Sequence, residues 1–348
     1  MSMRRTPPRP GPAPTSLYRY TERHVHEISY GDVKAATDRV AGRVRPVAVV
    51  PPAGGPRGPQ VWFALEYMQH TGSFKARGAQ NFLAAHRDAG TLPAAGVCIA
   101  SGGNAGLACA WAASRQGLNA TVFLPRNAPA LKVARLRGYG AEVRLVGTQY
   151  ADALDACEHF AAESGALAQH AYADPYVSAG AGTLMEEIHA QVPDLDTVVV
   201  SVGGGGLFAG VAASARQHGV RAVAVEPENC RALNAALEAG RLVDVEVESV
   251  ASDALGARRA WQGALAAVRQ DGARSVLVAE EQIVAARRSL WEERRIVVEH
   301  AAATALAALL PSEDPARGYR AAPGEKVAVV LCGANTDPTD LLEPPAAR

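Results

Sequence analysis

One lysine of the sequence stands where its amine could act as a nucleophile or a base. Lys75 follows a turn at Thr71 and Gly72 and precedes an alanine-rich run, and Ser73 is a candidate N-cap for a helix that begins there. A lysine in the first turn of a helix meets the partial positive charge of the helix N-terminus. Together with partial desolvation, this field lowers the pKa of the amine. Lys75 is therefore a candidate for amine chemistry, and the alternative is a solvated surface lysine.

Two glycine-bearing turns lie between an expected strand and an expected helix, where backbone amides and the helix dipole make an anion site. The first turn is Ser101-Gly102-Gly103-Asn104-Ala105. Its hydroxyl and side-chain amide suit a carboxylate better than a phosphate. An ordinary turn between strand and helix with an Asn cap would show the same residues.

The second turn, Gly203-Gly204-Gly205-Gly206, is the stronger anion site. Four glycines lose much chain entropy on folding and are kept where φ > 0 or close backbone approach is needed. A phosphate at the start of the next helix is the first interpretation. The spacing Gly-x-Gly-x-x-Ala from Gly204, with Glu226 further on, also fits a dinucleotide fingerprint. Against that, nothing before this turn resembles the opening half of a dinucleotide-binding fold.

A third turn, Cys-Gly-Ala-Asn from Cys332, follows the apolar run 326–331. Ligands of open α/β sheets bind at the carboxyl ends of the strands. Cys332 could therefore point into the same crevice as Lys75 and the two glycine turns. The alternative is a small buried hydrophobe with no chemical role.

Short β-rich runs alternate with helical runs, which predicts parallel sheets with right-handed crossovers. The expected strands cover residues 96–100, 120–124, 142–146, 167–172, 197–202, 221–225, 275–278 and 326–331. The expected helices cover residues 104–115, 130–137, 150–164, 181–191, 207–218, 231–238, 281–294 and 299–310. The predicted class is α/β, with two parallel-sheet domains that carry helices on both faces.

The same alternation predicts how the chain is divided. The Pro- and Arg-rich opening, residues 1–16, is expected to be a disordered tail. Residues 96–173 are expected to form a small substrate domain. Residues 17–95 together with 174–348 are expected to form a larger cofactor domain.

The composition excludes several classes of protein. Lys plus Arg and Asp plus Glu balance at 35 each, which argues against nucleic acid or an anionic membrane as a partner. No apolar run reaches the length of about 18 residues that a membrane span needs. The five cysteines are scattered without a Cys-x-x-Cys pair, so neither a disulfide framework nor a zinc site is expected. A reducing cytoplasm is the expected location.

The lysine and the three turns coincide with one family. Residues 69–79, Gln-x-Thr-Gly-Ser-Phe-Lys-Ala-Arg-Gly-Ala, resemble the cofactor-lysine motif of the fold-type II pyridoxal-phosphate (PLP) enzymes. The Arg-Gly-Ala ending resembles the serine/threonine dehydratases (ammonia-lyases). The turns at Ser101, Gly203 and Cys332 are similar to the family's substrate-carboxylate, phosphate and pyridine-nitrogen segments, in family order. The resemblance covers residues 60–336 and implies the tryptophan synthase β-like architecture.

The resemblance implies a role for each of these residues. Lys75 would form the Schiff base with pyridoxal 5'-phosphate, Phe74 would lie against the cofactor ring, and Cys332 would meet the ring nitrogen. The remaining residues would hold the cofactor phosphate (Gly203, Gly204, Gly205 and Gly206), the ring hydroxyl (Asn104) and the substrate carboxylate (Thr71, Ser101, Gly102, Asn104 and Ala105).

The implied activity is PLP-dependent β-elimination of water from L-threonine or L-serine, giving a 2-oxo acid and ammonia. The amine of Lys75 would remove the Cα proton. A neutral cysteine beside the ring nitrogen agrees with elimination, because it disfavours a long-lived carbanion. The alternatives are PLP-dependent β-replacement of the cysteine synthase kind, an NAD-binding oxidoreductase, and a non-catalytic ligand-binding relative. The family is commonly dimeric, which implies a homodimer that binds a small amino acid.

Some positions depart from the family pattern. Family racemases carry a serine where Gly102 stands, so racemisation is not expected. Their divalent-metal site begins at a glutamate such as Glu226, but Ala232 stands where an Asp ligand would be needed, so no metal is expected. The late Glu-Pro-x-Gly-Ala pattern of the family reads Glu-His-Ala-Ala-Ala from Glu299.

Overall fold

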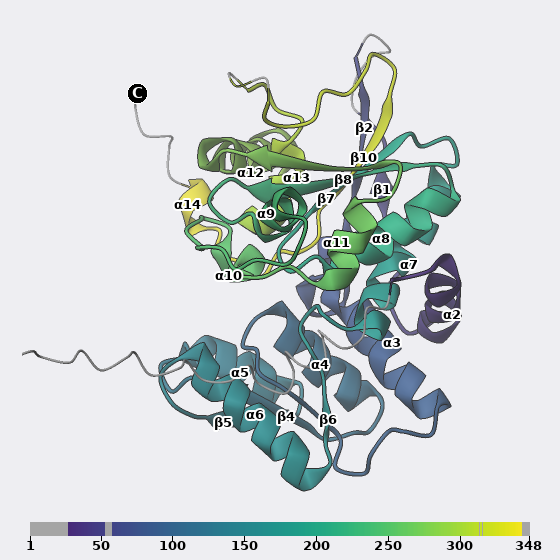
Figure 1. The fold of residues 1–348 in the computed structure, drawn as a ribbon. Helices are drawn as coiled ribbons and strands as arrows, with labels where there is room; N and C mark the ends of the chain where they lie inside the picture. Colours follow the sequence, from purple (N-terminus) through teal and green to yellow (C-terminus); the bar gives the residue numbers. More distant parts are fainter. Residues whose placement is uncertain (1–26, 53–57, 313, 315, 343–348) are drawn as a thin grey trace, which may run out of the picture.

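The structure is a computed structural model that describes residues 27–52, 58–312, 314 and 316–342. The tail predicted at residues 1–16 lies outside the described residues. Two β-sheets organise the described chain. Figure 1 shows the larger sheet with its helices in the upper part of the view and the smaller sheet in the lower part. The predicted α/β class with two mostly parallel sheets is confirmed.

The larger sheet has six strands in the order β1-β2-β10-β7-β8-β9. β1 pairs antiparallel with β2, and the other neighbours pair parallel. Val198, Val199 and Val200 in the centre of β7 are fully buried, as expected for a strand that is covered on both faces. The bounds are β1 (Val49–Val50), β2 (Gln60–Ala64), β7 (Thr197–Ser201), β8 (Arg221–Pro227), β9 (Ala273–Val278) and β10 (Lys326–Val330).

The smaller sheet has four parallel strands in the order β5-β4-β3-β6, and three helices connect them. All of these elements lie between residues 97 and 168, within the range 96–173 that the sequence predicts as a small domain. Their bounds are β3 (Val97–Ile99), α4 (Asn104–Arg115), β4 (Ala120–Leu124), α5 (Ala130–Gly138), β5 (Glu142–Leu145), α6 (Tyr150–Ser164) and β6 (Leu167–Ala168).

The remaining helices belong to the segments before and after the smaller sheet. They are α2 (Tyr30–Val40), α3 (Lys75–Asp88), α7 (Pro175–Gln191), α8 (Gly206–Gln217), α9 (Ala232–Ala239), α10 (Ser252–Leu255), α11 (Gln262–Val268), α12 (Glu280–Arg294), α13 (His300–Ala307) and α14 (Thr339–Leu342). Two short 3₁₀ helices, η1 (Glu66–Met68) and η2 (His70–Gly72), lead into α3.

Most predicted strands and helices agree with the structure, and three details differ. β6 ends at Ala168, so the strand predicted over residues 167–172 is much shorter in the structure. α7 begins at Pro175 rather than near residue 181, because the Asp174 side chain caps it by accepting the Val177 N–H at 3.0 Å. Ser73 is not the N-cap of α3, since its backbone pairs with the turn after β10 and Phe74 takes the cap position.

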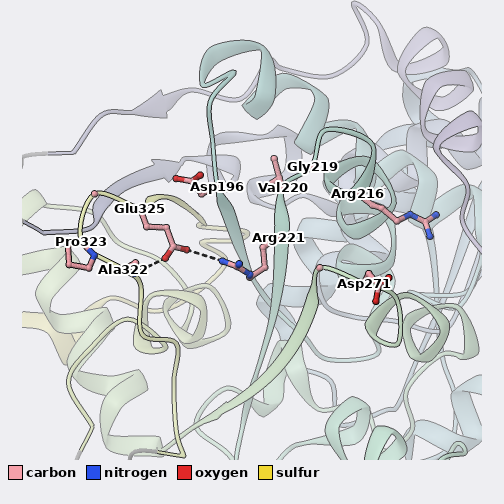
Figure 2. A pocket seen from close by; sticks show the side chains of 11 residues that line it. Asp196, Arg216, Gly219, Val220, Arg221, Asp271, Ala322, Pro323 and Glu325 are labelled. Carbon is pink, nitrogen blue, oxygen red and sulfur yellow. Dashed lines mark hydrogen bonds and ion pairs between the residues drawn. The ribbon is translucent and has the colours of Figure 1, made fainter.

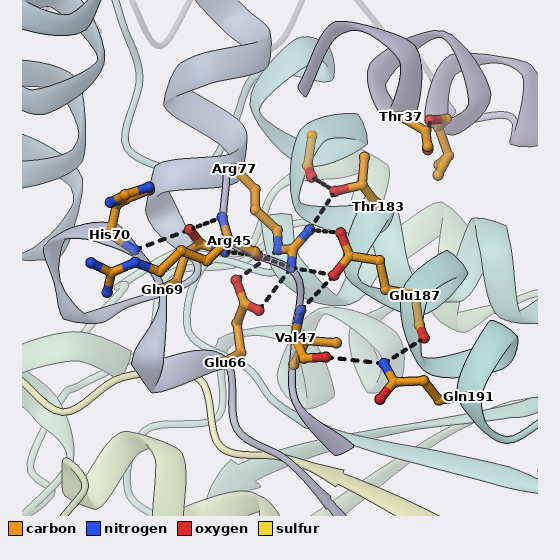
Figure 3. A network of polar contacts seen from close by, with 12 residues as sticks. Thr37, Arg45, Val47, Glu66, Gln69, His70, Arg77, Thr183, Glu187 and Gln191 are labelled. Atoms are coloured by element: carbon orange, nitrogen blue, oxygen red, sulfur yellow. Dashed lines mark hydrogen bonds and ion pairs between the residues drawn. The ribbon is translucent and has the colours of Figure 1, made fainter. Parts of the chain in front are cut away.

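A buried ion-pair network fixes the start of α3 to its neighbours (Figure 3). The guanidinium of Arg77 donates to Glu66 at 2.7 and 3.0 Å and to Glu187 of α7 at 2.7 and 2.8 Å. It also donates to the Thr183 hydroxyl at 3.2 Å and to the Arg45 carbonyl at 3.2 Å. Arg77 is completely buried, so every one of its donor groups needs these partners. The network sets the position of the helix that carries Lys75.

Candidate active site

Lys75 is the first residue of α3, as the sequence predicts. Its Nζ donates a hydrogen bond to the Ala171 carbonyl at 2.7 Å and lies 4.8 Å from the centre of the Phe74 ring. Burial lowers the pKa of the Lys75 amine to about 8, while the nearby Cys332 and Glu299 raise it. About a tenth of such an amine is uncharged at neutral pH, which is enough for it to act as a base.

The turn after β10 lies against the residues that precede Lys75. Ser73 forms a β-bridge with Gly333, and the Phe74 N–H donates to the Cys332 carbonyl at 3.0 Å. The Cys332 Sγ is 3.5 Å from the Oγ of Ser201, which is the last residue of β7. Burial raises the pKa of the Cys332 thiol to about 12, and the negative charge of Glu299 acts in the same direction. The thiol is therefore neutral, and it connects the Lys75 region to the strand that leads into the glycine turn.

A carboxylate and two amides connect the start of α4 with the turn after β10. The Glu299 carboxylate accepts hydrogen bonds from Asn104 Nδ2 at 2.9 and 3.1 Å and from the Asn335 N–H at 2.8 Å. The Asn335 side chain donates in turn to Asn104 Oδ1 and to the Thr71 carbonyl, each at 2.7 Å. Sequence reasoning did not give Glu299 or Asn335 a role. An acidic residue directly before an apolar, alanine-rich helix is the signal that marks Glu299.

Thr71 carries two marks of a ligand site. Its backbone is left-handed, with φ 62° and ψ 9°, which is rare for a β-branched residue. Its hydroxyl is buried and has no hydrogen-bond partner. Strain and an unsatisfied buried polar group tend to occur together where a protein receives a ligand. Thr71 also lies in the network of Asn335 and Asn104, beside the start of α4.

The turn before α4 presents backbone amides at a helix start. Gly103 is the N-cap of α4, and no side chain caps this helix. The Ser101 hydroxyl accepts the Gly103 N–H at 3.4 Å, and a Cβ on Gly102 would come within 2.9 Å of a β4 side chain. The N–H groups of Asn104 and Ala105, in the first helical turn, therefore lie beside the Ser101 hydroxyl at an uncapped helix start. This is the arrangement of an anion site.

The four-glycine turn leads from β7 into α8. Gly205 is the N-cap of α8 with φ 94°, a conformation that favours glycine, and no side chain caps this helix either. A Cβ on Gly204 would lie 2.2 Å from the Tyr172 ring, and a Cβ on Gly206 would lie 2.6 Å from the Tyr172 carbonyl. A Cβ on Gly203 would also be crowded, at 3.0 Å from the α10 backbone. The glycines thus permit both the turn and close packing around an uncapped helix start.

The predicted residues are brought together by these contacts. Phe74, Lys75 and Cys332 lie together, and Thr71 and Asn104 are joined through Asn335. The segment 170–172, which sequence reasoning did not identify, contacts both Lys75 and the glycine turn. The residues present fit PLP: a poised amine for its aldehyde, an uncapped helix start for its phosphate, an aromatic ring for its face and a neutral thiol for its ring nitrogen.

The dinucleotide interpretation of the glycine turn is not supported by Glu226. Its carboxylate is completely buried and accepts the N–H groups of Leu233 at 2.8 Å and Asn234 at 2.7 Å. Burial raises its pKa to about 8. An acidic residue that binds a ribose must instead be accessible at the strand end. Within the described part of the chain, no three His, Cys, Asp or Glu side chains gather where they could hold a metal ion.

An open pocket of about 710 Å³ lies at the amino ends of the strands of the larger sheet, away from the candidate site (Figure 2). Its residues Asp196, Arg221, Gly272 and Glu325 stand at or just before the amino ends of β7, β8, β9 and β10. The Arg221 guanidinium is paired within the protein, with the Tyr319 hydroxyl at 2.8 Å and Glu325 at 3.4 Å. Ligands of such sheets bind at the carboxyl ends, where Lys75 and Cys332 lie, so this pocket is not the candidate active site.

Comparison with known proteins agrees with this geometry. Residues 5–333 match the family model described as pyridoxal-phosphate dependent enzyme. The L-threonine ammonia-lyase of Geobacter sulfurreducens is 36% identical over 289 residues, which cover 81% of this chain and 71% of that protein. The L-threo-3-hydroxyaspartate ammonia-lyase of Saccharomyces cerevisiae is 32% identical over 314 residues, or 89% of this chain and 94% of that protein. The solved structure of maize serine racemase has a TM-score of 0.82 at 28% identity and covers 92% of this chain and 96% of that chain.

None of the helices within the described ranges is long and apolar enough to cross a membrane.

The matched family model extends over most of the sequence, including the lysine, both glycine turns and Cys332. The chain therefore belongs to the pyridoxal-phosphate-dependent enzymes of fold-type II, in the group of the dehydratases and ammonia-lyases.

Proposed function

We propose that this enzyme catalyses β-elimination of water from L-threonine or L-serine, giving a 2-oxo acid and ammonia. The observation that carries the proposal is the amine of Lys75. Its pKa is about 8, it is held by the Ala171 carbonyl, and it neighbours the segments that lead into both uncapped helix starts. The relatives named L-threonine ammonia-lyase support the choice of a hydroxy amino acid as substrate.

The residues that would hold PLP are those that the resemblance implies. Lys75 would carry it, Phe74 would lie against its ring, Asn104 would reach its hydroxyl and Cys332 its ring nitrogen. The amides of Gly203, Gly204, Gly205 and Gly206 would hold its phosphate. When bound, PLP supplies an electron sink that makes the Cα proton of an amino acid acidic.

The substrate carboxylate would be held at the start of α4. Ser101 and Thr71 offer hydroxyls, and Gly102, Asn104 and Ala105 offer backbone amides. The unsatisfied buried hydroxyl of Thr71 supports this assignment, because a carboxylate oxygen would complete it. The carboxylate would also be stabilised by the dipole of α4, which no side chain caps.

Lys75 would act as the proton acceptor. A neutral Nζ can take the Cα proton, and the Lys75 ammonium so formed can give a proton to the β-hydroxyl, which then leaves as water. The neutral Cys332 thiol cannot provide the negative charge that a protonated ring nitrogen would need. This arrangement disfavours reactions that require a long-lived negative charge at Cα, such as racemisation. Gly102 offers no side-chain base for the second face of Cα.

The test is to incubate the purified protein with PLP and a panel of hydroxy amino acids. We expect equal amounts of 2-oxo acid and ammonia from L-threonine or L-serine, and borohydride reduction should fix the cofactor to the peptide that contains Lys75. Lys75→Ala should lower the rate by at least about a thousandfold. Lys34→Ala, at an exposed lysine of α2, is the matched control and should leave the rate unchanged.

Other outcomes identify the alternatives. Turnover of L-serine only when a thiol is added would show β-replacement. Cofactor fixed to Lys75 without any ammonia release would show a binding protein rather than a lyase. A substrate preference for hydroxyaspartate over threonine would keep the elimination and change the substrate.

We also propose that the protein is a homodimer with the two-domain division described above. The two separate sheets support the division, and the α3 residues Ala76, Ala79, Phe82 and Leu83 pack in the hydrophobic cluster of the smaller sheet. Light scattering on an eluting peak should give twice the chain mass of 36.3 kDa. A mass equal to that of one chain contradicts the dimer.

A further inference from the structure

The turn of residues 170–173, between β6 and α7, contacts both parts of the candidate site. The Ala171 carbonyl accepts the hydrogen bond from Lys75 Nζ at 2.7 Å. The Tyr172 ring packs on Gly204 so closely that an added Cβ would lie 2.2 Å from it. The position of this turn therefore decides where the amine points relative to the glycine turn.

One side chain holds the turn in this shape. The Nδ1 of His170 lies 2.8 Å from the Ala173 N–H and 3.2 Å from the Tyr172 N–H. Both partners are donors, so Nδ1 accepts, and the single proton of the neutral ring is on Nε2. The ring also meets the Tyr172 ring edge to face, with 4.7 Å between centroids. His170 thus fixes the backbone at Tyr172 and Ala173, directly after the Ala171 carbonyl.

The ring stays uncharged in this position. Burial lowers the pKa of His170 to about 4, and the positive charge of Lys75 acts in the same direction. A protonated ring would present an Nδ1 donor to two N–H donors, and the turn would lose both hydrogen bonds. The acceptor role of Nδ1 is therefore maintained at neutral pH.

We propose that His170 is a positioning residue for Lys75, shaping the 170–173 turn so that the Ala171 carbonyl holds the amine away from water. The role given to Lys75 rests on the proposed function. The effect of His170 on the Lys75 amine does not, because it is present before any substrate binds.

The test compares two substitutions of His170. In His170→Asn the side-chain oxygen stands two bonds from Cβ, as Nδ1 does, so it can accept the same two N–H groups. His170→Leu has a similar volume and no acceptor. His159→Leu, at a histidine of α6 that is 74% exposed, is the matched control.

The readout is the pH dependence of Lys75 acetylation in cofactor-free protein, measured peptide by peptide by mass spectrometry. Wild type, His170→Asn and His159→Leu should show a midpoint of about 8. His170→Leu should raise the midpoint by about one pH unit, because a relaxed turn admits water and burial is the main cause of the lowered pKa. With PLP and substrate, His170→Leu should lower kcat about 10- to 100-fold, and His170→Asn should recover most of that loss.

The results separate this inference from the proposed function. An unchanged midpoint in His170→Leu, or a raised midpoint in both variants, overturns the role of Nδ1. A raised midpoint in His170→Leu alone supports it even if no amino acid is turned over.

If His170→Leu does not fold, nitrogen-15 shifts of the wild-type histidine ring decide. We expect an unprotonated Nδ1 throughout about pH 6 to 8, and a protonated Nδ1 overturns the proposal.

Discussion

Thr71 combines a strained backbone with an unsatisfied buried hydroxyl. Both features lower the stability of the fold, whereas the hydroxyl is expected to serve substrate binding. Thr71→Gly relieves the left-handed strain and removes the buried hydroxyl. We expect it to raise the free energy of unfolding by about 1 kcal/mol in urea. We also expect kcat/KM for the amino acid to fall about 10- to 100-fold, because a hydrogen bond to a charged carboxylate is lost.

Thr71→Ser is the matched control for that substitution. It keeps the hydroxyl at the same backbone position, so most of kcat/KM should remain. If Thr71→Gly were as active as wild type, Thr71 would not contact the substrate.

At the scale of the element, α7 begins on a carboxylate that titrates. Burial raises the pKa of Asp174 to about 6, although the N–H groups of Val177 and Tyr176 lower it. The folded state therefore binds this proton more tightly than the unfolded chain, where the pKa is about 3.9. The resulting stability is present below about pH 4 and is lost as the pH rises to about 6. Asp174→Asn keeps a capping oxygen without the charge. Its free energy of unfolding should therefore be about 1–3 kcal/mol higher than that of wild type near pH 7.

Urea unfolding near pH 4 and pH 7 checks this expectation, and the advantage of Asp174→Asn should shrink at the lower pH. Asp152→Asn is a control of opposite sign. Asp152 is an exposed residue of the first turn of α6, and hydrogen bonds from the Gln149 and Thr148 N–H groups lower the pKa of its carboxyl. Its substitution should reduce stability at pH 7. If both substitutions changed the free energy of unfolding at pH 7 in the same direction, the role assigned to the burial of Asp174 would be contradicted.

The start of α3 depends on Arg77 and its two carboxylate partners. Arg77→Ala leaves Glu66 and Glu187 without their cation, so the free energy of unfolding should fall by about 3–5 kcal/mol. Arg77→Lys should also be destabilising, because an ammonium cannot bridge both carboxylates with two bonds each. The partly exposed pair of Arg39 and Asp88 is the control, and Arg39→Ala should change stability by less than about 1 kcal/mol. Similar losses for Arg77→Ala and Arg39→Ala would contradict this account.

Which elements could be predicted follows from the range of the forces that form them. β7 and α4 were predictable because an apolar valine run and a glycine turn followed by small apolar residues are local signals. The Ser73 cap was predicted wrongly, since pairing with Gly333 competes with the local preference. The hydrogen bond between Glu299 and Asn104 joins residues 195 positions apart. Nothing in the local pattern of either residue specifies such a partner. The hydrogen bonds of His170 to Tyr172 and Ala173 are local, but the link from their turn to Lys75 spans 96 positions, so the sequence does not mark His170.

At the scale of the whole molecule, the candidate site lies where the two sheets meet. Lys75, Cys332 and the glycine turn belong to the segments of the larger sheet, whereas the turn at Ser101 precedes α4 of the smaller one. Glu299 and Asn104 connect the two by hydrogen bonds. The geometry of the site therefore depends on how the smaller sheet stands against the larger.

A second contact between the two parts is an ion pair at the surface. Lys132 of α5 donates to Asp253 of α10 at 3.0 Å, and both side chains are exposed. Burial is the main cause of the raised pKa of Glu299, and the charge of Asp253 acts in the same direction. A pair of this kind contributes about 0.2–1 kcal/mol, which is small against the stability of the fold but enough to change a binding equilibrium up to several-fold. Lys132→Glu should therefore raise KM for the amino acid about two- to fivefold and leave the free energy of unfolding within about 1 kcal/mol.

The exchanged pair Lys132→Glu with Asp253→Lys separates this interaction from other effects of the single substitutions. If the attraction between the two sheets is what matters, the double variant should restore KM toward the wild-type value, while Asp253→Lys alone raises it. The coupling should weaken at about 1 M salt, where the screening length is about 3 Å. Additive effects in the double variant, or a coupling that does not respond to salt, would mean that Lys132 and Asp253 act independently.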